Sequence, residues 1–238
     1  MDTIWQGLQK AIELIISLDP EVIGISWRSL SISATASLIA AAIALPLGAF
    51  IFHSTFPGKR ALISLINTLF SLPTVLVGLL VFMLFSRAGP LGTFGLLFTP
   101  TIMIIGQALL VTPLMLGLVI SAHSGIERQA KETAVALGAS RWQMGVMMIK
   151  EARFAIFTAF ILGFGRAISE VGLALMIGGN INGYTRVLTT AISLETGRGD
   201  IELSIALGII LLAIALIINF GLGWLQQREI RISKKAAE

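Results

Sequence analysis

The sequence contains no cysteine and only two histidines, His53 and His123. The absence of cysteine excludes disulfide frameworks, thiolate metal sites and cysteine nucleophiles, and two histidines are too few for a histidine-rich metal site. Charge is also scarce: 13% of the residues are charged, whereas a soluble domain carries about 25%. Hydrophobic residues make up 55% of the chain, and the mean hydropathy is +0.90. These values exclude an ordinary water-soluble fold and indicate an integral membrane protein in a lipid bilayer.

The charges gather in clusters between long apolar stretches, as loops between membrane spans require. The net charge of +4 and the pI of 9.9 therefore do not indicate a nucleic-acid partner. Five segments are long enough to cross about 30 Å of hydrocarbon, which takes about 20 helical residues. We predict an all-α protein with five transmembrane helices, at about 27–52, 61–86, 101–121, 155–177 and 203–225.

Small residues and prolines mark these spans. The first span carries a stripe at four-residue spacing, which favours close packing against another helix: Ala36, Ala40, Ala44 and Gly48. Three prolines lie inside spans, where each can kink its helix: Pro46, Pro73 and Pro113. Residues 88–100 contain Gly89-Pro90 and Thr99-Pro100 and are expected to form a turn with a short apolar segment.

The N-terminal segment, residues 1–24, differs from the spans. Apolar residues recur at helical spacing and the run ends at Asp19-Pro20; they are Ile4, Leu8, Ile12 and Ile15. The run is too short and too charged to span, so we expect an amphipathic helix in the membrane interface, anchored by Trp5. A soluble helical tail is the alternative. A signal peptide is not indicated, because the leading residues lack a basic region and no cleavage site follows.

The distribution of Lys and Arg predicts the orientation. With five spans, eleven of these residues fall on one side and five on the other. The richer side is expected to be cytoplasmic, so the N-terminus is external and the C-terminus cytoplasmic. The transmembrane domain then covers 25–226, the loop 122–154 and the basic tail 227–238 are cytoplasmic, and the loop 178–202 is external.

The cytoplasmic loop has the signature of two helices joined by a tight turn. Ser124-x-x-Glu127 and Ser140-x-x-Gln143 are capping boxes, and Gly138 stands where a left-handed glycine ends a helix. Apolar side chains in so short a loop have no obvious partner; they are Ala134, Leu137 and Trp142. They favour docking into a groove on another protein. A loop folded back on the membrane ends is the alternative.

The segment Glu132-Thr-Ala-Val-Ala-Leu-Gly138-Ala-Ser-Arg-Trp142 resembles the EAA loop of ABC-importer permeases, with glycine six residues after the glutamate. Thr133 replaces the first alanine of that pattern. Lys150-Glu151 stands where the family usually has a Leu-Pro pair, a departure that concerns a local kink and not the motif. The resemblance covers about residues 25–226.

The resemblance implies that this loop is a coupling helix docked on a separate cytoplasmic ATPase subunit. The residues it assigns to coupling are Glu132, Thr133, Ala134, Leu137, Gly138, Ala139, Ser140, Arg141 and Trp142. The chain itself has no phosphate-binding loop, because Gly58-Lys59-Arg60 lacks the upstream glycine and the hydroxyl. We therefore expect no enzyme and no cofactor on this chain, with ATP and Mg bound by the partner.

Two charges lie inside the fourth predicted span. Arg166 and Glu170 are four residues apart and would share one helix face. A lone charge there costs roughly 2.5–3.5 kcal/mol on insertion scales, and pairing offsets much of that cost. We expect the pair and the small residues around it to line a path or a helix interface: Gly165, Arg166, Ser169, Glu170 and Gly172. A purely structural pair is the alternative.

Phe164-Gly-Arg166-Ala-Ile-Ser-Glu170-Val-Gly172, followed by Ile177-Gly-Gly-Asn180, resembles molybdate and tungstate permeases. Gly183-Tyr-Thr-Arg186 and Gly197-Arg-Gly-Asp200 look most like the tungstate branch. Arg186 or Arg198 could line an external mouth, with Asn180 nearby. The run Val187–Leu194 is expected to be a short helix that either touches a binding protein or lies on the surface.

The sequence thus predicts a type I ABC-importer permease in a bacterial or archaeal cytoplasmic (inner) membrane. A second copy of the chain, two ATPase subunits and an external substrate-binding protein would complete it, because one set of five helices lines only half a path. The resemblance implies tungstate as the substrate, with molybdate or another small anion next. A homomeric channel or secondary transporter is a weaker alternative. A membrane enzyme lacks the necessary polar residues within the spans.

Overall fold

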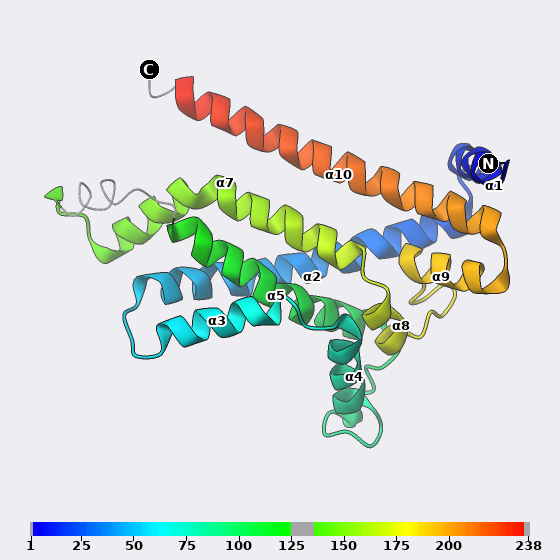
Figure 1. Cartoon of the computed structure of the whole chain (residues 1–238), viewed down its shortest axis with the longest axis horizontal. Coiled ribbons are helices and arrows are strands. Elements are labelled where there is room, and N and C mark those ends of the chain that lie inside the picture. The colour runs from blue at the N-terminus through cyan, green and yellow to red at the C-terminus, as the bar shows by residue number, and fades with distance from the viewer. Residues whose placement is uncertain (1, 125–135, 236–238) are drawn as a thin grey trace.

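The computed structural model describes residues 2–124 and 136–235, and within them every regular element is helical (Figure 1). The elements are α1 Asp2–Ile16, α2 Pro20–His53, α3 Lys59–Leu69, α4 Thr74–Phe85, the 3₁₀ turn Gly92–Phe94, α5 Pro100–Ser124, α7 Arg141–Ile168, α8 Gly172–Gly178, α9 Leu188–Arg198 and α10 Ile201–Lys235. Helices α2, α5, α7 and α10 run along the long axis, and α4 projects across it (Figure 1). The all-α prediction is confirmed, as is the turn in 88–100.

Helix α2 begins earlier than the expected residue 27. The Asp19 side chain accepts a hydrogen bond of 3.0 Å from the Val22 N–H, and Pro20 occupies the first turn, where its missing donor costs nothing. The helix therefore starts directly after α1, and it continues through Pro46 to His53.

The N-terminal helix α1 packs on α10 through its small residues. Ala11 is fully buried, and a Cβ at Gly7 would overlap Ile205. The apolar stripe predicted to enter the membrane interface stays largely outside this contact, since Ile4, Ile12 and Ile15 are about half-exposed or more. Trp5 is also exposed.

Three helices are long and apolar enough to span a membrane: α2, α5 and α10. Two further spans are bent pairs, so the described residues contain up to five spans, as predicted. The expected single helix at 61–86 is two helices, α3 and α4, which meet at 97°. The expected helix at 155–177 is also interrupted, with α7 and α8 at 60°.

Helix α7 also corrects the expected short loop helix. It runs without interruption for 28 residues from the loop into the membrane segment. Lys150-Glu151 supplies good helix formers where a Leu-Pro pair would have broken the helix. Similarly, α10 continues to Lys235 and includes most of the predicted tail.

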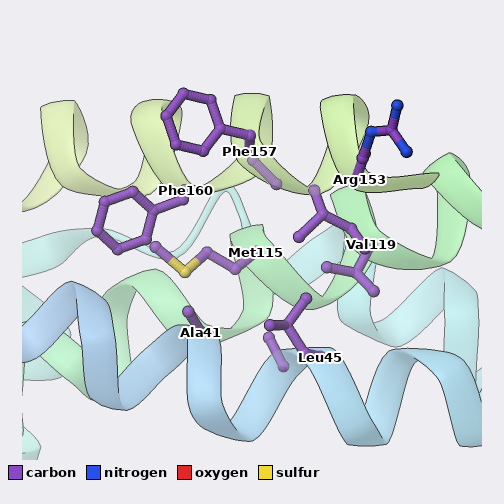
Figure 2. Close-up of a pocket in the computed structure, with 10 residues that line it drawn as sticks. Ala41, Leu45, Met115, Val119, Arg153, Phe157 and Phe160 are labelled. Carbon is purple, nitrogen blue, oxygen red and sulfur yellow. The ribbon is translucent and has the colours of Figure 1, made fainter. Parts of the chain in front are cut away.

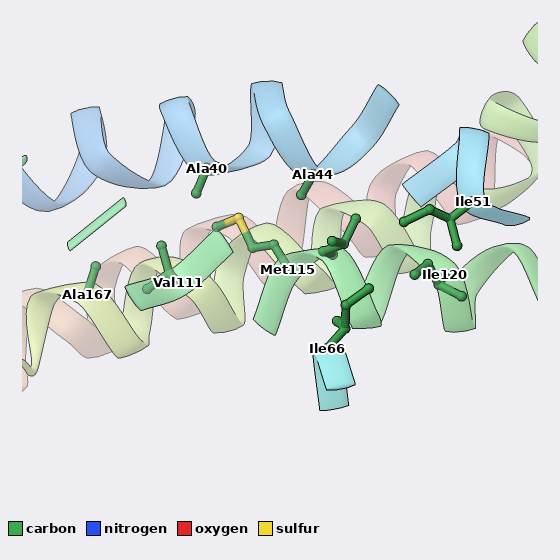
Figure 3. Close-up of a cluster of buried hydrophobic side chains, with 9 residues drawn as sticks. Ala40, Ala44, Ile51, Ile66, Val111, Met115, Ile120 and Ala167 are labelled. Atoms are coloured by element: carbon green, nitrogen blue, oxygen red, sulfur yellow. The ribbon is translucent and has the colours of Figure 1, made fainter. Parts of the chain in front are cut away.

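Among the described residues, buried apolar side chains form three clusters; one joins α1, α2, α9 and α10, and the other two contain the halves of the bent spans. The first of these two, here called the α3–α7 cluster, joins α2, α3, α5 and α7 (Figure 3) and contains Ala40, Ala44, Ile51, Ile66, Val111, Met115, Leu116, Ile120 and Ala167. The second, the α4–α8 cluster, contains Ile32, Val81, Ile102, Met103, Leu173, Ala174, Ile177 and Val187. Both bends lie between these two clusters, whereas α2 and α5 contribute to both.

The small-residue stripe of the first span packs as predicted. Ala36, Ala40 and Ala44 are fully buried, and a Cβ at Gly48 would overlap Val119 of α5. Helices α2 and α5 thus approach closely over most of their length.

Candidate functional site

The bend between α7 and α8 holds most of the residues predicted to line a path or interface. Helix α7 ends at Ile168, with Ser169 as its C-cap. Glu170 therefore lies beyond the helix and not on its face, which corrects the expected helical geometry. Its side chain is nevertheless 3% exposed, and its Oε2 lies 3.5 Å from an Arg166 guanidinium nitrogen. The predicted ion pair exists, with Arg166 half-exposed.

The Glu170 carboxylate also caps the helix that follows the bend. Its Oε1 accepts a hydrogen bond of 3.1 Å from the Leu173 N–H, one of the first donors of α8. Side-chain capping of this kind offers the backbone an alternative to a continuous helix. No proline stands between Ile168 and Gly172, and the side chain that bonds to the backbone at this break is the carboxylate of Glu170.

A residue that the sequence analysis missed ties this bend to the following loop. The Thr189 hydroxyl, buried on α9, donates a hydrogen bond of 2.9 Å to the Glu170 carbonyl oxygen. The contact joins residues 19 positions apart. No motif or periodicity predicts this hydrogen bond, because it depends on the tertiary fold of residues 171–188, which brings α9 back to the end of α7.

The N-terminal parts of α4 and α8 pack against each other beside the bend. A Cβ on Gly172 would lie 3.0 Å from Val75 Cγ2, and one on Gly78 would lie 3.2 Å from the Leu173 Cα. A larger side chain at either position would crowd the facing helix, so the two glycines allow the close packing of α4 and α8. Gly165 differs, since nothing lies within 4 Å of its Cβ position.

The three residues predicted for an external mouth are not brought together as one group. Asn180 adopts a positive φ of 51° and donates to the Thr190 carbonyl at 3.4 Å. Arg186 and Arg198 share a pocket of 480 Å³ between α1, α2, α9 and α10. Each is paired there with a carboxylate, Arg186 with Glu21 at 3.3 Å and Arg198 with Glu195 at 3.0 Å.

Charge in this pocket is balanced. The charged side chains that line it are three basic and three acidic ones: Lys10, Arg186, Arg198, Asp19, Glu21 and Glu195. The backbone beside it is held by Arg28, whose Nε donates to the Arg186 carbonyl at 3.1 Å. The predicted short helix is confirmed as α9, Leu188–Arg198.

A second pocket, of 250 Å³, lies between α2, α5 and α7 (Figure 2). Its lining is apolar apart from Arg153 and includes Leu45, Met115 and Phe160. Transferring an anion there would remove its hydration without compensating hydrogen bonds. This pocket therefore does not suit an oxyanion.

The loop 122–154 is described up to Ser124 and again from Ala136 onward. Gly138 has φ +76°, the left-handed conformation predicted for it, and Leu137 is 81% exposed. The Ser140 capping box forms, with the Gln143 N–H donating to Ser140 Oγ at 3.3 Å and the Ser140 N–H to Gln143 Oε1 at 2.8 Å. Ala139 lies in this turn, and Arg141 and Trp142 open α7. Glu132, Thr133 and Ala134 lie outside the described residues, as does Glu127.

Among the described residues, no group of three or more His, Asp or Glu side chains is placed to hold a metal ion.

Comparison with known proteins identifies the chain's family. Residues 36–231 match the model of the binding-protein-dependent transport system inner membrane component. The chain belongs to this family. The permease is 44% identical over 219 residues to the tungstate uptake system permease TupB of Peptoclostridium acidaminophilum, covering 92% of this chain and 96% of that one. It is 37% identical to TupB of Campylobacter jejuni, covering 92% of each chain. The molybdenum transport system permease ModB of Escherichia coli is 29% identical, covering 94% of this chain and 99% of that one.

Solved structures agree on the fold. A bacterial alginate ABC transporter in complex with an alginate-bound periplasmic protein matches with a TM-score of 0.74 at 20% identity, covering 93% of the permease and 86% of that chain. The MetNI methionine ABC transporter matches with a TM-score of 0.68 at 19% identity, covering 85% and 93%. The predicted ABC-importer permease fold and the location in the inner membrane are thus confirmed.

Proposed function

We propose that this permease forms the translocation path of an ATP-driven importer for tungstate, with molybdate as the second candidate. The observation that carries the substrate is the order of identities: 44% and 37% to two tungstate permeases, and 29% to a molybdenum permease. The family model, which covers 36–231, supports a binding-protein-dependent mechanism over a self-contained channel.

The path lies between two copies of the chain. The pocket between α2, α5 and α7 of one copy is apolar and unsuited to an anion. The outer face of α7 supports the proposal: Leu162 is 50% exposed, Arg166 is half-exposed, and Gly165 has open space around its Cβ position. Two such faces, related by a two-fold axis, would enclose a path with polar groups from both copies.

The partners occupy opposite ends. Two cytoplasmic ATPase subunits, which bind the ATP and Mg, dock on the loop around Gly138, where Leu137 is largely exposed. An external binding protein docks on the side of α9. The N-terminus is external, the C-terminus is cytoplasmic, and the stripe of α1 rests in the membrane interface.

Uptake of labelled tungstate tests this function. The permease is reconstituted with its ATPase and its binding protein, and unlabelled oxyanions compete for uptake. We expect unlabelled tungstate to compete best, molybdate next and sulfate least. Uptake that sulfate abolishes and tungstate does not affect would contradict the substrate assignment.

A further inference from the structure

The bend at Glu170 lies where two packing units of the molecule meet. Helices α3 and α7 belong to the α3–α7 cluster, whereas α4 and α8 belong to the α4–α8 cluster. The chain bends by 97° between α3 and α4 and by 60° between α7 and α8. Helices α2 and α5 run through both clusters. Because breaks in a helix absorb changes in backbone angle, the bend between α7 and α8 is where the orientation of α8 relative to α7 can change.

Glu170 bonds to both units across its bend. Its Oε2 pairs with Arg166 of α7 at 3.5 Å, and its Oε1 caps Leu173 of α8 at 3.1 Å. Its carbonyl oxygen accepts from Thr189 of α9 at 2.9 Å. One residue, 3% exposed, therefore connects three helices.

The hydrogen bonds of Glu170 with Leu173 and Thr189 each replace a backbone hydrogen bond that a continuous helix would make. In a continuous α-helix the Leu173 N–H would donate to the Ser169 carbonyl, and the Glu170 carbonyl would accept from the Ala174 N–H. Here the Glu170 carboxylate and the Thr189 hydroxyl take those places. The bent form thus depends on Glu170 and on the position of α9, and a shift of α9 changes the balance between bent and straight forms.

We propose that Glu170 is the positioning residue that holds this bend and that, through Thr189, transmits movement of α9 to the fourth span. This inference rests on the proposed function, in which α9 lies on the side of the binding protein. Binding there would pull or release Thr189 and so favour one angle between α7 and α8. The coupling is reciprocal: closure driven by ATP at the cytoplasmic loop, which is continuous with α7, would also move α9.

Thr189→Val is the sharpest test, because it removes one hydroxyl and keeps the shape of the side chain. The matched control is Thr112→Val, whose hydroxyl bonds only to the Ala108 carbonyl within its own helix at 2.6 Å. Glu170→Gln keeps an acceptor for Leu173 and removes the ion pair with Arg166. All variants are measured as the complete complex with ATPase and binding protein in lipid nanodiscs.

Two readouts separate positioning from folding. In Thr189→Val we expect the maximal ATPase rate with saturating binding protein to fall about fivefold, the lower end for coupled sites, with the basal ATPase rate and the yield of complex unchanged. Thr112→Val should match the wild type in every measurement. Amide hydrogen exchange at 171–175 should be faster in Thr189→Val and Glu170→Gln, and unchanged in Thr112→Val.

Each outcome decides between the two claims. Wild-type stimulation retained in Thr189→Val, or a parallel loss of basal and stimulated rates, would overturn the role of Glu170. A wild-type complex that the binding protein does not stimulate would count against the proposed function. In that case the amide exchange rates at 171–175 still test whether Glu170 and Thr189 hold the bend. Equal exchange rates in the wild type and the three variants would overturn that role.

Discussion

The two bent spans differ in what makes the bend. Between α3 and α4, Pro73 is the N-cap of α4, and it has no N–H to continue a helix from α3. Between α7 and α8 stands the buried Glu170, whose carboxylate bonds to α7 and α8 and whose backbone carbonyl accepts a hydrogen bond from α9. The first bend follows from the covalent structure of a proline, whereas the second depends on tertiary contacts. A contact can be exchanged during a transport cycle and a pyrrolidine ring cannot, so the second bend is suited to movement.

The largest effect is expected for Glu170→Ala, which removes the cap and the ion pair together. Hydrogen bonds to charged groups contribute about 1.5–3 kcal/mol, and about 1.4 kcal/mol is tenfold in an equilibrium constant. We expect transport to fall at least about tenfold and the melting temperature of the complex to drop. Glu170→Gln should recover part of both. Transport by Glu170→Ala at the wild-type rate would show that the bend needs no carboxylate.

Arg166→Gln should have a smaller effect, because it breaks the ion pair and leaves the cap of α8 in place. The buried Glu170 carboxylate then loses its cation, which disfavours the folded form by about 1–3 kcal/mol. Transport is expected to fall several-fold, and Arg166→Lys should restore most of it. Lys10→Gln, which breaks an exposed pair of 3.1 Å with Glu13, serves as the control and should leave transport unchanged.

The opposite end of α7 offers a backbone comparison. Gly138 has a positive φ, so Gly138→Ala strains the turn by about 1–3 kcal/mol and should weaken docking of the ATPase, seen as lost co-purification. The same substitution at Gly145, inside α7 with nothing within 4 Å, should leave docking intact. Equal docking in both variants would contradict the proposal that the loop around Gly138 contacts the ATPase.

Pro73→Ala should have the smallest effect. Residue 73 has φ −60°, which alanine adopts freely, and α4 remains packed on α8 through Gly78. Greater freedom of the unfolded chain costs about 0.4–1 kcal/mol, and transport should stay within about twofold. Loss of transport as large as that of Glu170→Ala would mean that both bends move.

Local chemistry explains which features the sequence predicted correctly. The Ala36 to Gly48 stripe, the left-handed Gly138 and the Ser140 capping box each depend on neighbouring residues or a single helix face, and each is confirmed. Pro73 was recognised as a source of a kink, although its span was drawn as one helix.

Tertiary context explains the remainder. The Thr189 contact and the position of Glu170 outside a helix depend on contacts between separate elements, which periodicity does not report. Charge pairing of Arg166 with Glu170 was predicted from spacing, and the ion pair is present in a different backbone geometry. The predicted span starts at the uncharged run that follows Arg28, whereas the helix itself starts at the cap that Asp19 and Pro20 supply.

The most direct test of the central claim is the energy requirement of tungstate movement. The complex of permease and ATPase is placed in proteoliposomes with ATP trapped inside and the loaded binding protein outside. We predict that labelled tungstate accumulates only when both ATP and binding protein are present, and that a non-hydrolysable ATP analogue abolishes the accumulation. Equal tungstate entry without ATP, or entry through the permease alone, would contradict the importer and favour a channel.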